Sequence, residues 1–145
     1  MENIDESVYQ RAILVLGYRD HSVQELRRKL LTKGFEEEAI EAVLVYLLKK
    51  KYLDDDNFSQ QYCQYRFEKG YGRLKIRYEL QQRGVAVPLI QSALQNYADE
   101  WYTSAQKVHQ QRFGDKPKNQ QQKNKQIRFL QNRGFEWEEI NACFR

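Results

Sequence analysis

The segment Leu30-Leu31-Thr32-Lys33-Gly34-Phe35 returns twice further along the chain in related form. Its counterparts are Leu80-Gln81-Gln82-Arg83-Gly84-Val85 and Leu130-Gln131-Asn132-Arg133-Gly134-Phe135, which places the three glycines 50 residues apart. Each copy has a leucine four residues before the glycine, a basic residue just before it and an apolar residue just after it. An isoleucine follows six residues after each of these three glycines. Such a fixed period indicates an array of similar structural units.

The repeated phrase has the features of a helix that ends and turns into the next helix. A basic residue in the last turn complements the negative end of the helix dipole. A glycine just beyond that turn can adopt the left-handed backbone conformation that closes many helix C-termini. The sequence therefore predicts helix C-caps at Gly34, Gly84 and Gly134.

The residues on both sides of the first glycine have the spacing of amphipathic helices. Before it, Ser22 and Glu25 form the pattern of a capping box at a helix start. After it, apolar residues recur at helical spacing, at Ile40, Val43, Leu44, Leu47 and Leu48. A further helix precedes each such pair, and we expect it at about 8–18, 56–69 and 98–113.

These patterns predict an all-α fold of three tandem three-helix repeats in an elongated, curved array. The first repeat, with a short N-terminal tail, is expected over residues 1–53, the second over 54–97 and the third over 98–145. Each unit is too small to bury its own apolar face, so neighbours must stack. A single compact nine-helix globule is the alternative. Residues 51–54 are a candidate linker, and the polar run 114–125 is predicted to be flexible.

The composition favours a surface-rich protein with an anionic partner. Of the 145 residues 41% are hydrophobic and 30% are charged, and the net charge is +4. Positive charge gathers between residues 69 and 133, where thirteen basic residues accompany four acidic ones. This part of the chain is the expected face for an anionic partner.

The sequence also predicts a cytoplasmic protein that makes no membrane contact. No apolar run approaches the ~20 residues of a membrane helix, and the acidic start of the chain lacks the layout of a secretory signal. Cys63 and Cys143 are isolated in the sequence, so we expect free thiols.

The residues offer no constellation that would support catalysis, and we expect no enzyme, no metal and no cofactor. His21 and His109 lie far apart, without neighbours at metal-ligand spacing. The acidic run 54–56 suits Mg²⁺ in principle, but capping of a helix start is the favoured role. The segment Gly70-Tyr71-Gly72 is too short for a nucleotide-binding loop. Binding is therefore the predicted function.

The strongest candidate binding surface lies in the central unit. A helix that begins near Gly72 places Arg73 and Arg77 on one face, and an arginine can fork onto a phosphate or a carboxylate. The alternative is a solvated basic face that keeps the protein soluble. Aromatic side chains can also stack on bases, and for Tyr71 the sequence favours neither stacking nor packing. The predicted partner- or DNA-binding residues here are Lys69, Tyr71, Arg73, Lys75, Arg77 and Arg83.

A second basic stretch lies in the third unit and includes Lys123, Lys125 and Arg128. It is predicted either to track a phosphate backbone or to form a solvated loop. The other tyrosines with helical spacing among apolar residues are predicted to belong to the core, namely Tyr62, Tyr65, Tyr78 and Tyr97.

In this order and at this period, the quoted stretches resemble the RecX family. The segment RDHSVQEL at 19–26, with the phrase around Gly34, is similar to the first unit of that family. YLDDDNF at 52–58 resembles the link to the second unit, GYGRLKI at 70–76 the second unit itself, and FLQNRGF at 129–135 the third. The resemblance extends from about residue 8 to residue 144, in line with a repeat array.

The resemblance implies a regulator, mainly an inhibitor, of the bacterial recombinase RecA. Such proteins lodge in the groove of the RecA–single-stranded-DNA filament and dampen recombination, DNA repair and the SOS response. The implied partners are the RecA filament, single-stranded DNA and, as a further candidate, double-stranded DNA, and we expect a monomer. Two alternatives remain: a helical DNA-binding protein whose primary partner is nucleic acid, and a scaffold for an unrelated protein.

Overall fold

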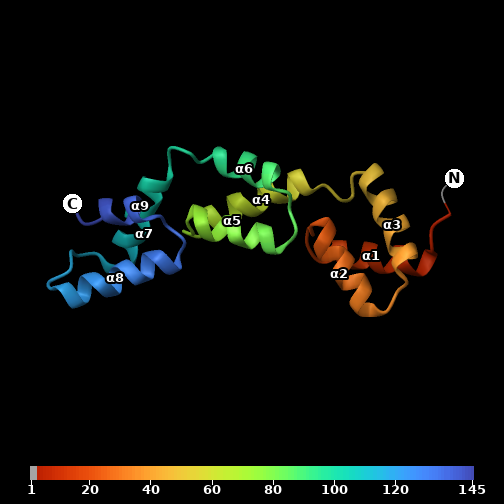
Figure 1. Ribbon diagram of the computed structural model, residues 1–145, viewed down its shortest axis with the longest axis horizontal. Coiled ribbons are helices and arrows are strands. Elements are labelled where there is room, and N and C mark those ends of the chain that lie inside the picture. Colours follow the sequence, from red (N-terminus) through yellow and green to blue (C-terminus); the bar gives the residue numbers. More distant parts are fainter. Residues whose placement is uncertain (1–2) are drawn as a thin grey trace.

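The computed structural model describes residues 3–145, and this range contains nine helices and no strand (Figure 1). The predicted all-α class is therefore confirmed. The first two residues of the N-terminal tail lie outside the described residues. The helices are α1 (Glu6–Tyr18), α2 (Val23–Lys33), α3 (Glu37–Lys49), α4 (Asp55–Glu68), α5 (Arg73–Gln82), α6 (Val87–Gln95), α7 (Trp101–Phe113), α8 (Gln120–Asn132) and α9 (Trp137–Ala142).

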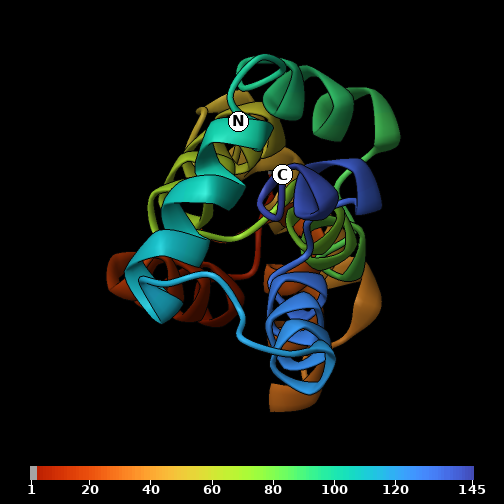
Figure 2. The same ribbon diagram turned by 90° about the vertical axis from the view of Figure 1, so that its left-hand side faces the viewer.

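The helices form three groups of three that follow one another along the long axis of the molecule (Figure 1). The first group contains α1 to α3, the second α4 to α6 and the third α7 to α9. Seen along that axis, the groups lie behind one another (Figure 2). This tandem arrangement confirms the predicted repeat array and excludes the compact globule.

Each group has a core of its own, built from the repeated positions. The leucine four residues before each repeated glycine is 0% exposed, and the isoleucine six residues after it is at most 1% exposed. These residues are Leu30, Leu80, Leu130, Ile40, Ile90 and Ile140. Burial of such side chains contributes roughly 1.5–3 kcal/mol each. Trp101 belongs to both the second and the third group, because it is the first residue of α7 and packs in the core of the second group.

Hydrogen bonds at the helix starts explain where several helices begin. The Ser22 hydroxyl accepts from the N–H of Glu25, while the Glu25 carboxylate accepts from the N–H of Ser22, so the predicted capping box is present. Asp5 and Asp54 accept backbone N–H groups in the same way at α1 and α4.

The second helices of the three groups lie end to end, in the order α8, α5 and α2 (Figure 1). The Ser22 hydroxyl donates a hydrogen bond of 2.6 Å to the carbonyl oxygen of Arg83. Fifty residues later, the N–H of Gly72 donates a bond of 2.7 Å to the carbonyl oxygen of Arg133. Carbonyl groups at the end of one helix are thus satisfied by the start of the next. The 50-residue period therefore extends to the contacts between groups.

All three repeated glycines lie at the C-terminal ends of these helices and have positive φ angles. The values are +100° at Gly34, +76° at Gly84 and +96° at Gly134. Side chains with a Cβ rarely adopt this conformation.

The structure corrects two expectations. The run 114–125 is helical from Gln120 onward, because the Asn119 side chain accepts the N–H of Gln122 and starts α8. Tyr65 and Tyr78 are 54% and 60% exposed and do not belong to the core. Their helices bury only one face, and helical spacing by itself does not tell which face a tyrosine occupies. Tyr62 and Tyr97 do pack against the second core.

Candidate functional site

Two arginines of the predicted central surface connect neighbouring groups. Arg73 forms an ion pair with Glu136 of the third group. Arg83 places Nε 3.4 Å from a carboxylate oxygen of Glu25 in the first group, and its guanidinium lies 4.6 Å from the ring centre of Tyr62. These two cations therefore contribute to the junctions of the array before any partner binds.

Tyr71 is enclosed by cations and is not free to stack on a base. The Arg66 guanidinium lies 3.7 Å from its ring centre, the Arg133 guanidinium 4.6 Å and the Lys75 ammonium 5.5 Å. Lys75 Nζ also lies 3.4 Å from the carbonyl oxygen of Asn132. The structure thus gives Tyr71 and Lys75 contacts at the junction between the second and third groups.

Lys69 and Arg77 are the exposed members of the predicted central set. Arg77 lies one turn after Arg73, and both line a hollow of about 750 Å³ between α5, α6 and α9. The lining of this hollow also includes Glu136, Glu138 and Glu139. Burial raises the pKa of the Glu139 carboxyl.

The predicted third-unit cations lie on α8. Lys125 and Arg128 are exposed, whereas the ammonium of the half-buried Lys123 lies 5.5 Å from the ring centre of Phe144. From residue 101 to residue 135, which covers α7 and α8, the chain has eight basic residues and one acidic residue. This is a strongly cationic hairpin.

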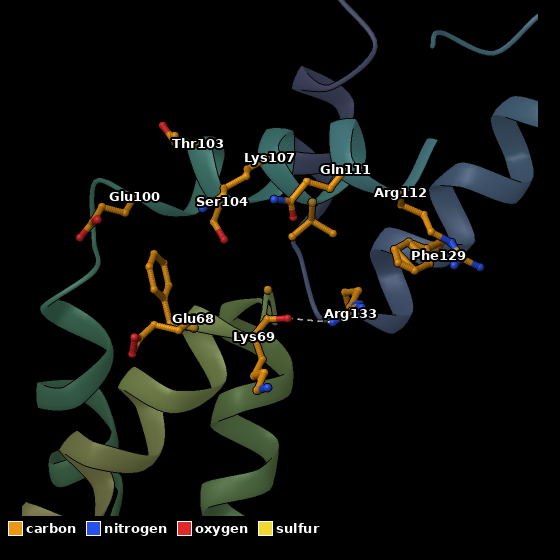
Figure 3. A pocket seen from close by; sticks show the side chains of 13 residues that line it. Glu68, Lys69, Glu100, Thr103, Ser104, Lys107, Gln111, Arg112, Phe129 and Arg133 are labelled. Atoms are coloured by element: carbon orange, nitrogen blue, oxygen red, sulfur yellow. Dashed lines mark hydrogen bonds between the residues drawn. The ribbon is translucent and has the colours of Figure 1, made fainter. Parts of the chain in front are cut away.

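A groove of about 860 Å³ lies where α4, α7 and α8 meet (Figure 3). We call it the junction groove, because its walls come from the second and third groups. Its cationic side chains are Lys69, Lys107, Arg112 and Arg133. Sequence reasoning missed Lys107 and Arg112 as site residues and assigned Arg133 only to a helix end. The excess of basic residues between 69 and 133 was the one signal for them.

An alternating series of guanidinium groups and aromatic rings begins beside the junction groove and includes three of its lining residues, Arg133, Phe129 and Arg112. Arg66 and Arg133 both lie against Tyr71, and Arg133 lies 5.2 Å from the ring centre of Phe129. Arg112 lies 5.1 Å from the same ring of Phe129. Each such cation–π contact contributes about 0.5–1 kcal/mol at exposed sites. The series connects α4 to α7 and α8 and fixes the positions of the groove's arginines.

Other chemistry is sparse in the described part of the chain. Residues 3–145 contain no group of three or more side chains placed to hold a metal ion. Cys63 and Cys143 are free thiols, and burial raises their pKa values to about 12 and about 11. His109 is buried, and its Nε2 lies 2.7 Å from Oε1 of Gln126. No helix within these residues is long and apolar enough to span a membrane.

Comparison with protein families gives three consecutive matches. The first three-helix domain of RecX matches residues 9–47, the second matches residues 54–94 and the third matches residues 98–144. The chain belongs to the RecX family.

Curated RecX relatives match over most of their length. The regulatory protein RecX of Vibrio parahaemolyticus is 38% identical over 133 residues, which cover 91% of this chain and 86% of that one. Regulatory protein RecX of Serratia proteamaculans is 37% identical, and the match covers 93% and 94% of the two chains. RecX proteins are regulators and not enzymes, so binding surfaces rather than catalytic groups carry their function.

Solved RecX structures share the fold. The crystal structure of RecX from Lactobacillus salivarius has a TM-score of 0.79 at 20% identity, covering 94% of this chain and 92% of that chain. A second crystal structure, of regulatory protein RecX, has a TM-score of 0.83 at 22% identity and covers 94% and 71%. At this sequence identity, the structural similarity is evidence for the fold alone.

Proposed function

We propose that this RecX family protein regulates the recombinase RecA by binding the RecA–single-stranded-DNA filament, mainly as an inhibitor. The observation that carries the proposal is the match to three RecX domains in order along the chain. Binding opposes the growth or persistence of the filament. Recombination, DNA repair and the SOS response are dampened as a result.

The elongated shape supports this proposal. Three groups in one row, joined by hydrogen bonds between the ends of α8, α5 and α2, form a long body (Figure 1). Stacked repeats of this kind present extended binding surfaces. A long body that follows a helical groove contacts several RecA subunits at once, and a single copy of the chain is enough. We accordingly propose a cytoplasmic monomer.

Cations of the second and third groups supply the contacts that we propose with the filament. Arg77 and Lys69 are exposed on the second group, and the exposed Lys125 and Arg128 lie on the third together with the half-buried Lys123. A RecA–DNA filament presents both acidic protein surface and DNA phosphate, and cations attract either one. We include single-stranded DNA as a direct contact, with double-stranded DNA as a further candidate. Arg73 and Arg83 act mainly through the junctions that they hold.

The test is a titration of the protein into filaments of the cognate RecA on single-stranded DNA. DNA-dependent ATP hydrolysis by RecA should fall as the protein is added. A correctly folded protein that leaves ATP hydrolysis and filament length unchanged would contradict the proposal. Tight, steeply salt-dependent DNA binding without any effect on RecA would instead favour a DNA-binding protein.

A further inference from the structure

The junction groove includes Lys69 of the central surface that the sequence favours, but its other cations, Lys107, Arg112 and Arg133, belong to the third group. We propose that this groove binds the sugar–phosphate backbone of single-stranded nucleic acid without reading its bases. The inference rests on the proposed function in one respect, namely that the protein touches the DNA of the filament directly.

The junction groove has a net positive charge, because four cationic side chains and two carboxylates line it. Among the described residues, Lys69, Lys107, Arg112 and Arg133 form no ion pair with a carboxylate. Lys69, Lys107 and Arg112 are also exposed. The acidic lining residues, Glu68 and Glu100, lie toward the end of the groove away from Arg112 and Arg133 (Figure 3). An anion therefore fits at the arginine end.

The two arginines are held in place before a ligand arrives. Both guanidinium groups lie 5.1–5.2 Å from the ring centre of Phe129. Arg133 also donates through a terminal nitrogen to the carbonyl oxygen of Lys69, at 3.1 Å. A stacked guanidinium retains N–H groups at its edge, and these match the geometry of a phosphate. Less side-chain entropy is lost on binding when the cation is already ordered.

The aromatic rings of the groove are occupied, which argues against base stacking. Phe67 is stacked on Tyr97 with 4.4 Å between the ring centres and also contacts Trp101. Phe129 contacts Phe113 in addition to its two arginines. Proteins that bind single strands through their bases need free aromatic faces. The groove therefore favours contact with the backbone.

The third helices of the outer groups are unsuited to reading bases in double-stranded DNA. In helix-turn-helix proteins the N-terminal residues of the second helix of the motif enter the major groove. Here α3 begins with Glu37 and Glu38, and the first turn of α9 contains Glu138 and Glu139. Their carboxylates repel phosphate groups. The cations of α7 and α8 offer the better surface.

The charge around the groove favours nucleic acid over an acidic protein segment. The groove continues into the cationic hairpin of residues 101–135, which has a single acidic residue. A phosphodiester chain carries one negative charge per nucleotide and can use such a surface along its whole length. An acidic patch on a protein would neutralise only part of this cationic surface.

The experiment measures direct binding of labelled single-stranded oligonucleotides by fluorescence anisotropy, without RecA, at several salt concentrations. The variant is Lys107→Gln/Arg112→Gln, two exposed positions on α7. The matched control is Lys33→Gln/Lys50→Gln, two exposed cations of the first group. Each lost phosphate contact makes the slope of log K against log salt less steep by about 0.7. At about 0.1 M salt this corresponds to a loss of about fivefold in affinity. The double variant should therefore bind about 25-fold more weakly, and the control should bind like the parent.

Further outcomes separate this inference from the proposed function. Equal affinity for homopolymeric and mixed-sequence oligonucleotides supports backbone binding, and a strong base preference overturns it. A groove variant that binds DNA like the parent but no longer inhibits RecA would show that the groove contacts protein. If the parent inhibits RecA without binding DNA by itself, the inference fails while the proposed function stands. Circular dichroism of the variant provides the check on folding.

Discussion

Gly134 packs directly against Lys75 at the junction between the second and third groups. A β-carbon at position 134 would lie 2.4 Å from Cβ of Lys75 and 2.6 Å from its backbone nitrogen. Gly34 is the equivalent position in the first group, and a β-carbon there would meet no atom within 4 Å. Both glycines have positive φ angles. The same repeated residue thus has one structural reason at position 34 and two at position 134.

We expect Gly134→Ala to destabilise the protein more than Gly34→Ala. The left-handed conformation costs roughly 1–2 kcal/mol in both variants. Overpacking at the junction adds about 1–3 kcal/mol at position 134. Urea unfolding followed by circular dichroism measures both effects. Equal losses in the two variants would mean that the junction yields easily to a methyl group.

The ion pair between Arg73 and Glu136 should orient the third group relative to the second. Arg73→Glu places two carboxylates together and should destabilise the junction. Because both side chains are partly exposed, we expect a modest loss of about 0.5–1 kcal/mol from the pair. The swapped variant Arg73→Glu/Glu136→Arg should recover most of the stability and of the RecA inhibition. A swap that recovers stability but not inhibition would identify Arg73 as a partner contact.

Arg77→Glu should weaken inhibition of RecA without changing the fold, since Arg77 is exposed and forms no ion pair among the described residues. A charge at the rim of an interface acts mainly on the association rate and its salt dependence. We therefore expect a larger effect at low salt than at high salt in the RecA ATP hydrolysis assay. Lys33→Glu, an exposed position on α2, is the control for a general effect of charge. If Arg77→Glu inhibits like the parent at both salts, the contact surface lies elsewhere.

His21 should make the first group sensitive to mild acid. The side chain is 3% exposed, its Nδ1 lies 2.9 Å from the carbonyl oxygen of Arg19, and its Nε2 lies 2.8 Å from the ammonium of Lys29. Burial lowers the pKa of the imidazole below its ordinary 6.5; the hydrogen bond to the carbonyl of Arg19 opposes this shift, and the charges of Arg19 and Lys29 add to it. The folded state therefore favours the neutral ring, and stability present above pH 6.5 is lost as the pH falls below it.

The measurement is urea unfolding of the parent and of His21→Gln between about pH 7.5 and about pH 5, the range in which a histidine titrates. The parent should lose more stability than the variant across this interval, because glutamine does not titrate. Parallel losses in the two proteins would contradict a role for His21. A comparison of differences also removes the contribution of other titrating groups.

The repeat and the helices could be predicted from the sequence because their causes are local. Ser22 and Glu25, only three residues apart, form the capping box that starts a helix. A glycine likewise ends a helix through the conformation of its own backbone. The buried leucine and isoleucine of each copy, such as Leu80 on α5 and Ile90 on α6, each lie on the apolar face of an amphipathic helix. The RecX resemblance rests on the same local phrases, which is why it covers nearly the whole chain.

The sequence alone could not distinguish a binding cation from a structural one. Arg73 and Arg77 are both arginines one turn apart on α5, yet among the described residues only Arg73 contacts a carboxylate. Its partner, Glu136, lies 63 residues further along the chain. Exposure depends in the same way on which helix face a neighbour covers, so that Tyr62 is partly buried and Tyr78 is exposed. Such partners are set by the packing of one group on the next.

The sequence by itself determined the helices, the three-group repeat, the family and the part of the chain that carries positive charge. Only the tertiary structure decided which of these charges converge. Lys69 follows α4 in the second group, whereas Lys107, Arg112 and Arg133 belong to the third, and they form one groove because the two groups stack end to end. Helix formation depends on interactions within a few residues. A surface shared by two groups depends on their relative orientation, which hydrogen bonds and ion pairs between distant residues fix.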